Sequence, residues 1–533
     1  YLELAKFFID QHGCNSKDHT PYAVFNDLYN QDEMPLRKRS TAEGHCVRAM
    51  YLLSGMIDVA EAFDDQELKN ACYRIYDNVV NHRMYITGGI GSTHIGEAFT
   101  IDYHLPNRTA YTETCAAIAL AQASERMIGA SDDFGTTADS HRTTAIDSGT
   151  SAGSPVLSMA LFADTIERTI YNGILSGISL DGKGFFYENP LEIDLAFNHP
   201  NSSTKDKEYY PETQRREVFS CSCCPPNVLR FYASLGDYLY SLSDDTVFVH
   251  QYMENTANIA PSLTIRQKTD YPLSGKIQFD INKEPGCQIR HVALRLPAWC
   301  ESYELALTHT LKNGYLYIDL DADLDADLDA DLDATFDPNL DTEIDPDTDL
   351  NCDADLDMKN DPASDQRDHI RFELNLSMEP RFVTADARIH ELNGKVCLMR
   401  GPVVYALEQI DQPEINLFDL KVDPSQKPVL GDVLTAQGVS MMLPVIKASG
   451  TLSQTERDHA PTHYHDDDPE PSHMPCPDGI KATDQEHREP SPVFSSSLYV
   501  SYQNTSTPCS LTYIPYYAFA SRGESNLRVW VPA

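Results

Sequence analysis

The spacing of apolar residues changes once along this chain, and that change limits the folds open to it. Up to about residue 242, apolar side chains recur every three or four positions, as in segments 41–63, 114–128, 161–178 and 228–242. This spacing is typical of amphipathic helices. From about residue 246, short runs of alternating apolar and polar residues are separated by turn residues, which predicts β-strands. The sequence therefore predicts an all-helical first part and a β-rich second part.

Length and charge narrow the class of protein. The chain has 533 residues, of which 41% are hydrophobic, and a formal net charge of -40. This length and composition are typical of a multidomain globular protein. Strong acidity disfavours nucleic acid and anionic membranes as partners, and no apolar run approaches the roughly 18 residues of a spanning helix. We therefore expect no nucleic-acid partner and no membrane partner; a homodimer is compatible with the sequence.

We expect three domains with three insertions. The helical domain covers 1–243 and contains an insertion at 129–153; a first β-sandwich domain covers 244–394 and a second covers 395–533. The β-domains carry insertions at 319–368 and 453–490. The insertion at 129–153 consists mainly of small and polar residues, the one at 319–368 is strongly acidic, and the one at 453–490 is polar. These compositions predict disorder. Two alternatives are a calcium site in the acidic insertion and a weak transition-metal site at His463, His465 and His473.

Cysteine usage and the first residues bear on the compartment. Thirteen cysteines lack the regular spacing of a small disulfide scaffold, so we expect a mostly reduced chain. The sequence opens YLELAKFFIDQHG, which contains no targeting signal. The compartment is unknown from sequence, and a cytoplasmic location is favoured over secretion.

Residues 219–227, FSCSCCPPN, hold three thiols within four positions. Adjacent cysteines form a disulfide only with strain, so a metal or a reactive thiolate is the better interpretation. Upstream, Glu113 and Cys115 stand two residues apart at an expected helix start. Together with Cys223 and Cys224 they would form a Cys3Glu metal shell.

Five motifs in order carry a resemblance to a known family. They are AEGHCVRAMYLLSGM, RMYITGGIGSTHIGEAFTIDYHLPN, YTETCAAIA, YNGILSGISLDGKGFFYENPLE and CSCCPPN. The set resembles glycoside hydrolase family 127, the β-L-arabinofuranosidases, and the C-terminal KVCLMRGPVVYALE resembles the β-domains of that family. Apart from the insertions, the resemblance covers nearly the whole chain.

The resemblance implies a fold, a metal and an activity. The fold is an (α/α)6 barrel followed by β-sandwich domains. The cofactor is Zn²⁺, bound by Glu113, Cys115, Cys223 and Cys224. Cys223 is also the implied nucleophile and Glu97 the general acid/base of a retaining hydrolysis. The implied substrate is an arabinofuranose-containing oligosaccharide or glycoconjugate, from which a terminal β-L-arabinofuranosyl group is released.

Three further residues belong to this expectation. His45 and Tyr187 match positions at which the family touches the sugar, although His45 is equally compatible with a hydrogen-bonded core histidine. Cys221 is not expected to be a ligand. To act first as an acid, Glu97 must begin protonated, so we expect burial to raise its pKa.

The sequence also departs from the family. Family members begin with a longer helical stretch, so the N-terminal part of the barrel is expected to be missing, which would expose apolar helix faces. Alternative functions are an inactive scaffold stabilised by structural zinc, a carbohydrate-binding remnant, or a related pentosidase.

Overall fold

The fold is described by a computed structural model of the whole chain. It describes residues 1–14, 27–131, 157–196, 212–217, 221–322, 368–435, 442–453 and 506–533. The expected insertions at 129–153, 319–368 and 453–490, with His463, His465 and His473, lie almost wholly outside these ranges. Of the helices within them, none combines the length and apolar character needed to cross a bilayer.

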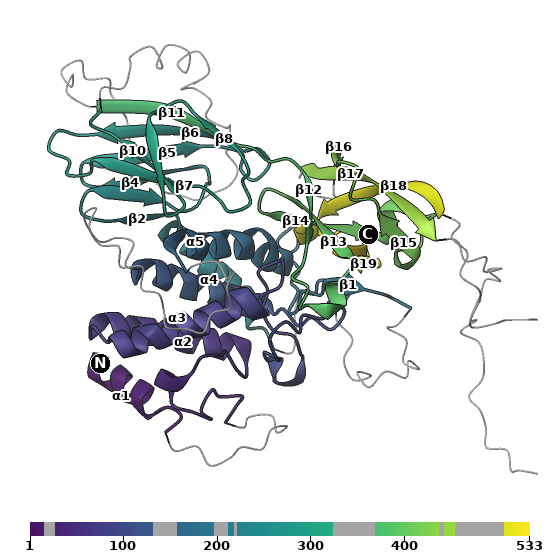
Figure 1. Cartoon of the computed structure of the whole chain (residues 1–533), viewed down its shortest axis with the longest axis horizontal. Helices are drawn as coiled ribbons and strands as arrows, with labels where there is room; N and C mark the ends of the chain where they lie inside the picture. Colours follow the sequence, from purple (N-terminus) through teal and green to yellow (C-terminus); the bar gives the residue numbers. More distant parts are fainter. Residues whose placement is uncertain are drawn as a thin grey trace, which may run out of the picture.

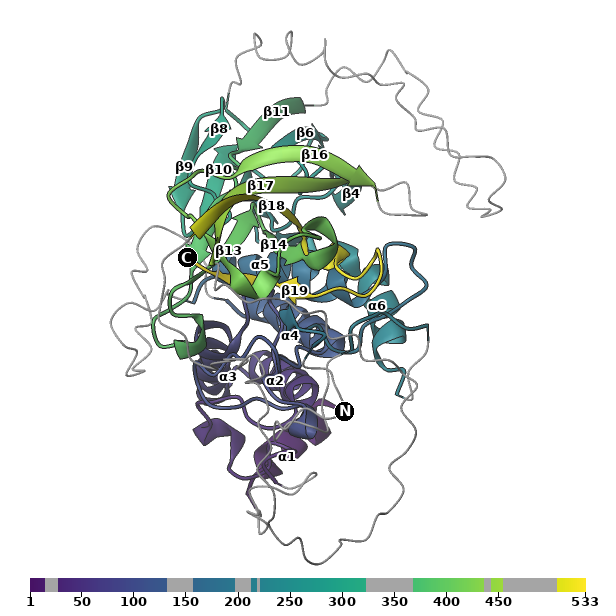
Figure 2. The same ribbon diagram turned by 90° about the vertical axis from the view of Figure 1, so that its right-hand side faces the viewer.

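The first part of the chain is a stack of helices. In both views α1 lies farthest from the sheets and α5 lies next to them (Figures 1 and 2). The helices are α1 (Leu2–Gln11), α2 (Cys46–Ala62), α3 (Gln66–Asn78), α4 (Thr114–Gly129), α5 (Met159–Arg168) and α6 (Cys224–Ala233). Helix α1 exposes Leu2, Leu4, Phe7 and Phe8 and buries only Ile9.

Helix α4 is the centre of this stack. It packs against α2, α5 and α6, and most of its residues are buried, including a run of small side chains in TCAAIALAQAS. A helix that is apolar on all sides belongs in the interior, and alanines let its neighbours approach closely. The start of α4 is thereby fixed deep inside the protein.

The second part contains three antiparallel or mixed sheets. Two five-stranded sheets have the orders β2-β3-β7-β10-β9 and β4-β5-β6-β11-β8, and they lie together in both views (Figures 1 and 2). Their strands are β2 (Tyr240–Leu242), β3 (Thr246–Val249), β4 (Asn255–Ala260), β5 (Leu263–Lys268), β6 (Lys276–Lys283), β7 (His291–Arg295), β8 (Tyr303–Leu305), β9 (His309–Lys312), β10 (Tyr315–Asp319) and β11 (Asp368–Leu376).

The third sheet has ten strands, nine of them from the C-terminal region. Its main path is β1-β19-β14-β18-β17-β15, and β12, β13, β16 and β20 branch from it. The strands are β1 (Glu192–Ile193), β12 (Arg381–Thr384), β13 (Lys395–Arg400), β14 (Val403–Glu408), β15 (Leu420–Val422), β16 (Val429–Thr435), β17 (Met442–Ser453), β18 (Ser506–Pro515), β19 (Leu527–Arg528) and β20 (Trp530–Pro532).

The expectation of helices followed by sheets is confirmed, with two corrections. The helix expected over 228–242 ends at Ala233, and Tyr240–Leu242 pairs with β3 instead. The helical part is also not purely helical, because Glu192 and Ile193 pair with Arg528 and Leu527 of β19. In both cases a partner strand distant in sequence satisfies the backbone hydrogen bonds, which local periodicity does not record.

A buried ion cluster joins α5 to the first β-region. Arg295 of β7 is fully buried and binds both Asp164 and Glu167 of α5. Glu167 also accepts hydrogen bonds from Trp299 Nε1 at 2.8 Å and from the Tyr271 hydroxyl at 2.5 Å. A buried charge is tolerated when it is paired and hydrogen-bonded. This cluster therefore fixes the sheets against the helices.

We predict that Arg295→Met destabilises the protein by about 3–5 kcal/mol, because it leaves two buried carboxylates without their counter-charge. Urea unfolding followed by circular dichroism measures the change. The control is Arg388→Gln, which removes an exposed ion pair with Asp386 and a contact with the Tyr103 ring, and it is expected to lower the unfolding midpoint much less. Equal midpoints for the two variants would contradict the role given to the cluster.

Candidate active site

The N-termini of two helices meet inside the helical stack. Glu113 is the N-cap residue of α4, with Cys115 in the first turn, and Cys223 is the N-cap residue of α6, whose first residue is Cys224. Helix N-termini favour negative charge and lower the pKa of thiols. Prolines are tolerated in a first helical turn because its N–H groups have no intrahelical partner. The sequence CCPP therefore starts α6 at the two thiols.

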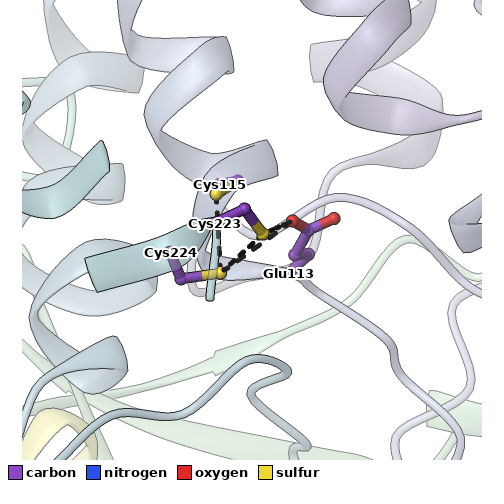
Figure 3. Close-up of side chains that lie close together, drawn as sticks. All are labelled: Glu113, Cys115, Cys223 and Cys224. Atoms are coloured by element: carbon purple, nitrogen blue, oxygen red, sulfur yellow. Dashed lines mark hydrogen bonds between the residues drawn. The ribbon is translucent and has the colours of Figure 1, made fainter. Parts of the chain in front are cut away.

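Four potential ligand atoms converge there, as Figure 3 shows. The Cys115 and Cys224 sulfurs are 3.4 Å apart, and the Cys223 and Cys224 sulfurs are 3.8 Å apart. Oε1 of Glu113 lies 3.7 Å from the Cys223 sulfur and 3.9 Å from the Cys224 sulfur. All four ligand atoms lie within 4.8 Å of one another.

These residues fit a metal ion. Two sulfurs bound tetrahedrally at about 2.3 Å from one ion are about 3.8 Å apart, close to the separations seen here. Glu113 is buried, and its Oε2 atom has no hydrogen-bond partner within the described ranges. An unpartnered buried carboxylate oxygen is costly, and a cation between the four groups would remove that cost. The cluster can therefore hold a metal ion.

The pKa values of the four groups are shifted in opposite directions. Hydrogen bonds from Cys115 and Cys224 hold the pKa of Cys223 well below its usual value. Hydrogen bonds with Cys115 and Cys223 raise the pKa of Cys224, and the hydrogen bond with Cys223 raises the pKa of Cys115. Burial, together with the charges of Glu97 and Cys223, raises the pKa of Glu113. Of these four groups, Cys223 is therefore the one that ionises most readily.

Glu97 approaches this cluster from the glycine-rich segment between α3 and α4. That segment is irregular, as expected, and is held by isolated bridges from Ala98 to Thr93 and His45. Glu97 itself has a positive φ of 51°, a strained conformation for a residue with a side chain. Persistent strain at a residue facing a cluster of ionisable groups is typical of functional sites.

The glycines of this segment permit a close backbone approach. Gly88 has a φ of +77°, and a Cβ atom there would lie 2.9 Å from Thr169, directly after α5. Only glycine meets both requirements. The turn is thereby pressed onto the helical stack, with Glu97 farther along the same segment.

Hydrogen bonds connect Glu97 to the other predicted residues. Oε2 of Glu97 lies 2.9 Å from Nε2 of His45, the N-cap residue of α2. The Tyr187 hydroxyl donates to both Glu97 oxygens at 3.3 Å. Tyr187 is positioned by its own backbone, because its carbonyl oxygen accepts from the N–H of Thr114 at the start of α4.

All seven residues singled out from sequence therefore come together: His45, Glu97, Glu113, Cys115, Tyr187, Cys223 and Cys224. Cys221 is exposed and outside the four-ligand cluster, although it contacts Cys223. Sequence reasoning missed Tyr111, which is buried and hydrogen-bonded to Glu97. Its position two residues before Glu113 was the available signal.

The expectation that Glu97 has a raised pKa is wrong. Burial acts to raise it, but hydrogen bonds from His45, Tyr111 and Tyr187, with the charge of His45, lower the pKa of Glu97 below its usual value. Sequence could not anticipate this, because these partners come from three separate segments. Glu97 is therefore ionised at neutral pH in this state.

Three family models match successive parts of the chain. Residues 1–237 match the β-L-arabinofuranosidase GH127 catalytic domain, 246–328 the GH127 middle domain, and 380–532 the glycoside hydrolase family 127 C-terminal domain. The chain belongs to glycoside hydrolase family 127. The resemblance inferred from the five motifs is confirmed, and with it the enzyme class, a glycosidase.

Individual relatives agree with this membership. A non-reducing end β-L-arabinofuranosidase of Bifidobacterium longum subsp. longum is 27% identical over 563 residues, covering 99% of this chain and 67% of the relative. The crystal structure of a GH127 β-L-arabinofuranosidase from Geobacillus stearothermophilus T6 matches with TM-score 0.70 and 28% identity, covering 100% of this chain and 69% of that one. A solved GH127 β-arabinofuranosidase matches with TM-score 0.64 and 27% identity, covering 100% of this chain and 65% of the solved chain.

We predict that metal uptake by this family 127 protein releases at least about two protons per ion near pH 7. The thiols of Cys115 and Cys224 have pKa values raised above their ordinary values, so both are protonated near pH 7 and must ionise to become ligands. The pKa of Glu113 is also raised, which adds to the proton release as the pH is lowered. Protons compete with the metal, so its affinity falls as the pH is lowered. Titration calorimetry in buffers of different ionisation enthalpy measures the number. Cys221→Ser should not change it, and release of one proton or none would contradict the ligand set.

Proposed function

We propose that this glycosidase releases terminal β-L-arabinofuranosyl groups by a retaining mechanism, with Cys223 as nucleophile and Glu97 as acid/base. The supporting observation is an asymmetry of burial. Glu113, Cys115 and Cys224 are almost fully buried, whereas Cys223 is half-buried and the Glu97 side chain is 31% exposed. A ligand can therefore reach both the thiol of Cys223 and the carboxyl group of Glu97. The choice of sugar rests on the names of the relatives.

The metal we propose is zinc, held by Glu113, Cys115, Cys223 and Cys224. Three sulfurs and one carboxylate oxygen suit its preference for soft and borderline ligands. Bound zinc would keep the cysteines ionised, so that a thiolate is present at neutral pH. A closed structural site would bury all four ligands equally, and the half-buried Cys223 favours a catalytic one.

The first half of the reaction joins the sugar to the enzyme. The Cys223 sulfur attacks the anomeric carbon while Glu97 donates its proton to the departing glycosidic oxygen. The carbon–oxygen bond breaks as a carbon–sulfur bond forms, giving a thioglycosyl intermediate. The leaving alcohol departs neutral.

The second half releases the sugar. Glu97, now a carboxylate, takes a proton from water, and the water oxygen attacks the anomeric carbon. The carbon–sulfur bond breaks and the thiolate is restored. Two inversions give net retention of configuration.

Glu97 must gain a proton before the first half can begin. In the free protein its contact with His45 opposes this. A sugar hydroxyl that takes the His45 hydrogen bond would leave burial as the main influence, and burial raises the pKa of a carboxyl group. We propose that substrate binding itself switches Glu97 to its acid form, with His45 and Tyr187 as sugar contacts.

We also propose the finer fold assignments. The helices of 1–243 would belong to an (α/α)6 barrel, and 244–394 and 395–533 would each form a β-sandwich domain. The near agreement of these boundaries with the three family matches supports the division. The substrate would be an oligosaccharide or glycoconjugate carrying arabinofuranose; a cytoplasmic location and a homodimer stay proposals.

We predict that Cys223→Ser reduces hydrolysis at least about a thousandfold and Glu97→Gln about a hundred- to ten-thousandfold. The measurement is turnover of a panel of p-nitrophenyl pentofuranosides, and Cys221→Ser is the matched thiol control, expected to remain active. Unchanged turnover in both Cys223→Ser and Glu97→Gln would contradict the proposed mechanism. Zinc-loaded wild type that cleaves nothing would favour the inactive scaffold, and preference for another pentose would favour the related pentosidase.

We predict that Glu113→Gln and Cys224→Ser each lower the zinc content well below one ion per chain, measured by plasma mass spectrometry. Both positions are buried, so no other group can replace the lost ligand. Chelation of wild type should abolish turnover, and added zinc should restore it. Full zinc content in both variants would show that the ion binds elsewhere.

A further inference from the structure

A cleft lies between the first β-region and the ten-stranded sheet, apart from the candidate active site. Its volume is about 780 Å³, within the range of ligand pockets. One wall comes from residues 273–275, 302–304 and 375–380, and the other from Arg400 and residues 427–430. None of these residues belongs to the cluster around Glu113.

Arg400, the last residue of β13, is the unusual residue of this cleft. Its side chain is only 9% exposed, and one Nη2 atom donates to the carbonyl oxygen of Leu273 at 2.9 Å. The Tyr405 hydroxyl is hydrogen-bonded to the same guanidinium group. The Nε atom has no partner, and within the described ranges no carboxylate lies within salt-bridge distance of Arg400.

Several other arginines with little exposure are satisfied in one of two ways. Arg215 donates to the backbone carbonyl oxygens of Ser176, Tyr517 and Phe519. Four others each have a carboxylate: Arg39 with Glu33, Arg83 with Asp102, Arg295 with Glu167 and Arg528 with Glu192. A buried charge without a counter-charge costs several kcal/mol. In a chain with a net charge of -40, the absence of a carboxylate beside Arg400 among the described residues points to an external anion.

A second cation stands at the rim of the cleft. Lys427 Nζ lies 3.0 Å from Glu379 Oε2, and both side chains are about two-thirds exposed. Exposed ion pairs contribute little and rearrange easily, so Lys427 can turn to a ligand. A carboxylate matches the fork geometry of Arg400, with Lys427 as a second contact.

The remaining walls suit a sugar. Glu304 accepts a hydrogen bond from Asn375 at 3.2 Å, and both line the cleft with Ser302. The carboxylate of Glu304 and the hydroxyl of Ser302 can both accept hydrogen bonds from the hydroxyl groups of a sugar ring. Leu273, Val429 and Leu430 are about half exposed and offer an apolar surface for the C–H face of a ring.

We propose that this cleft binds a carboxylate-bearing sugar, a uronic acid residue of a glycan chain, with the carboxylate on Arg400 and Lys427. That the ligand is part of a glycan rests on the proposed function, whereas recognition of the carboxylate rests on the cleft alone. A second glycan site on the same chain raises the effective concentration of a polymeric substrate near the active site.

Titration calorimetry on the full chain tests the proposal with three probes: methyl glucuronide, methyl glucoside and acetate. We expect the glucuronide to bind at least about tenfold more tightly than either of the others, a difference of about 1.4 kcal/mol. Arg400→Gln should weaken glucuronide binding at least tenfold. Lys427 is exposed, so Lys427→Ala should weaken glucuronide binding severalfold without changing the unfolding midpoint. Arg388→Gln, an exposed arginine outside the cleft, is the matched control.

The alternatives are separable. Equal binding of glucuronide and glucoside would overturn carboxylate recognition, and equal binding of glucuronide and acetate would overturn the sugar. Unchanged affinity in Lys427→Ala and Arg400→Gln would overturn the site; if Arg400→Gln fails to fold, Lys427→Ala decides. Because these assays measure binding of sugars that are not arabinofuranosides, their failure is distinct from failure of the proposed hydrolysis.

Discussion

Much of the helical part is organised around four ionisable groups at the meeting point of two helix N-termini. Burying Glu113, Cys115 and Cys224 together with a half-buried Cys223 is unfavourable unless positive charge lies opposite them. The helix ends of α4 and α6 supply part of it, and the unpartnered Oε2 atom of Glu113 indicates that a cation would supply the rest. This requirement explains why both helices begin where they do.

The surrounding structure holds the reactive side chains at this junction. The interior position of α4 fixes Glu113 and Cys115, and the backbone contact of Tyr187 with Thr114 fixes the tyrosine beside them. Glu97 is brought in by a strained turn that glycines allow to approach the stack. The ten-stranded sheet braces the same region, since Asn172 after α5 bonds the backbone of Pro402 and Val404. Catalytic precision in such an arrangement comes from the rigid elements behind the loops.

Two buried arginines illustrate opposite uses of charge between domains. Arg295 is saturated by Asp164 and Glu167 and joins the first sheets to α5. Arg400 has backbone and tyrosine contacts but no carboxylate among the described residues. The first arrangement stabilises a fixed interface, and the second leaves a favourable place for an anion at an open one. The same residue type is therefore structural in one interface and a ligand-binding candidate in the other.

Sequence by itself determined the broad order of helices and strands, the family, and the ligand motifs, because helical and strand periodicity and the Glu113-x-Cys115 and CSCCPPN spacings are local. It failed at Tyr240–Leu242 and at Glu192–Ile193, where a distant strand supplies the hydrogen-bond partners. The tertiary structure alone decided that His45, Tyr111 and Tyr187 surround Glu97 and lower its pKa, and that Cys223 is the most accessible thiol of the four-ligand cluster. It also decided that Arg400 has no carboxylate partner among the described residues. Each of these depends on burial and on charges from segments far apart in the chain, and no local pattern encodes the distance between them.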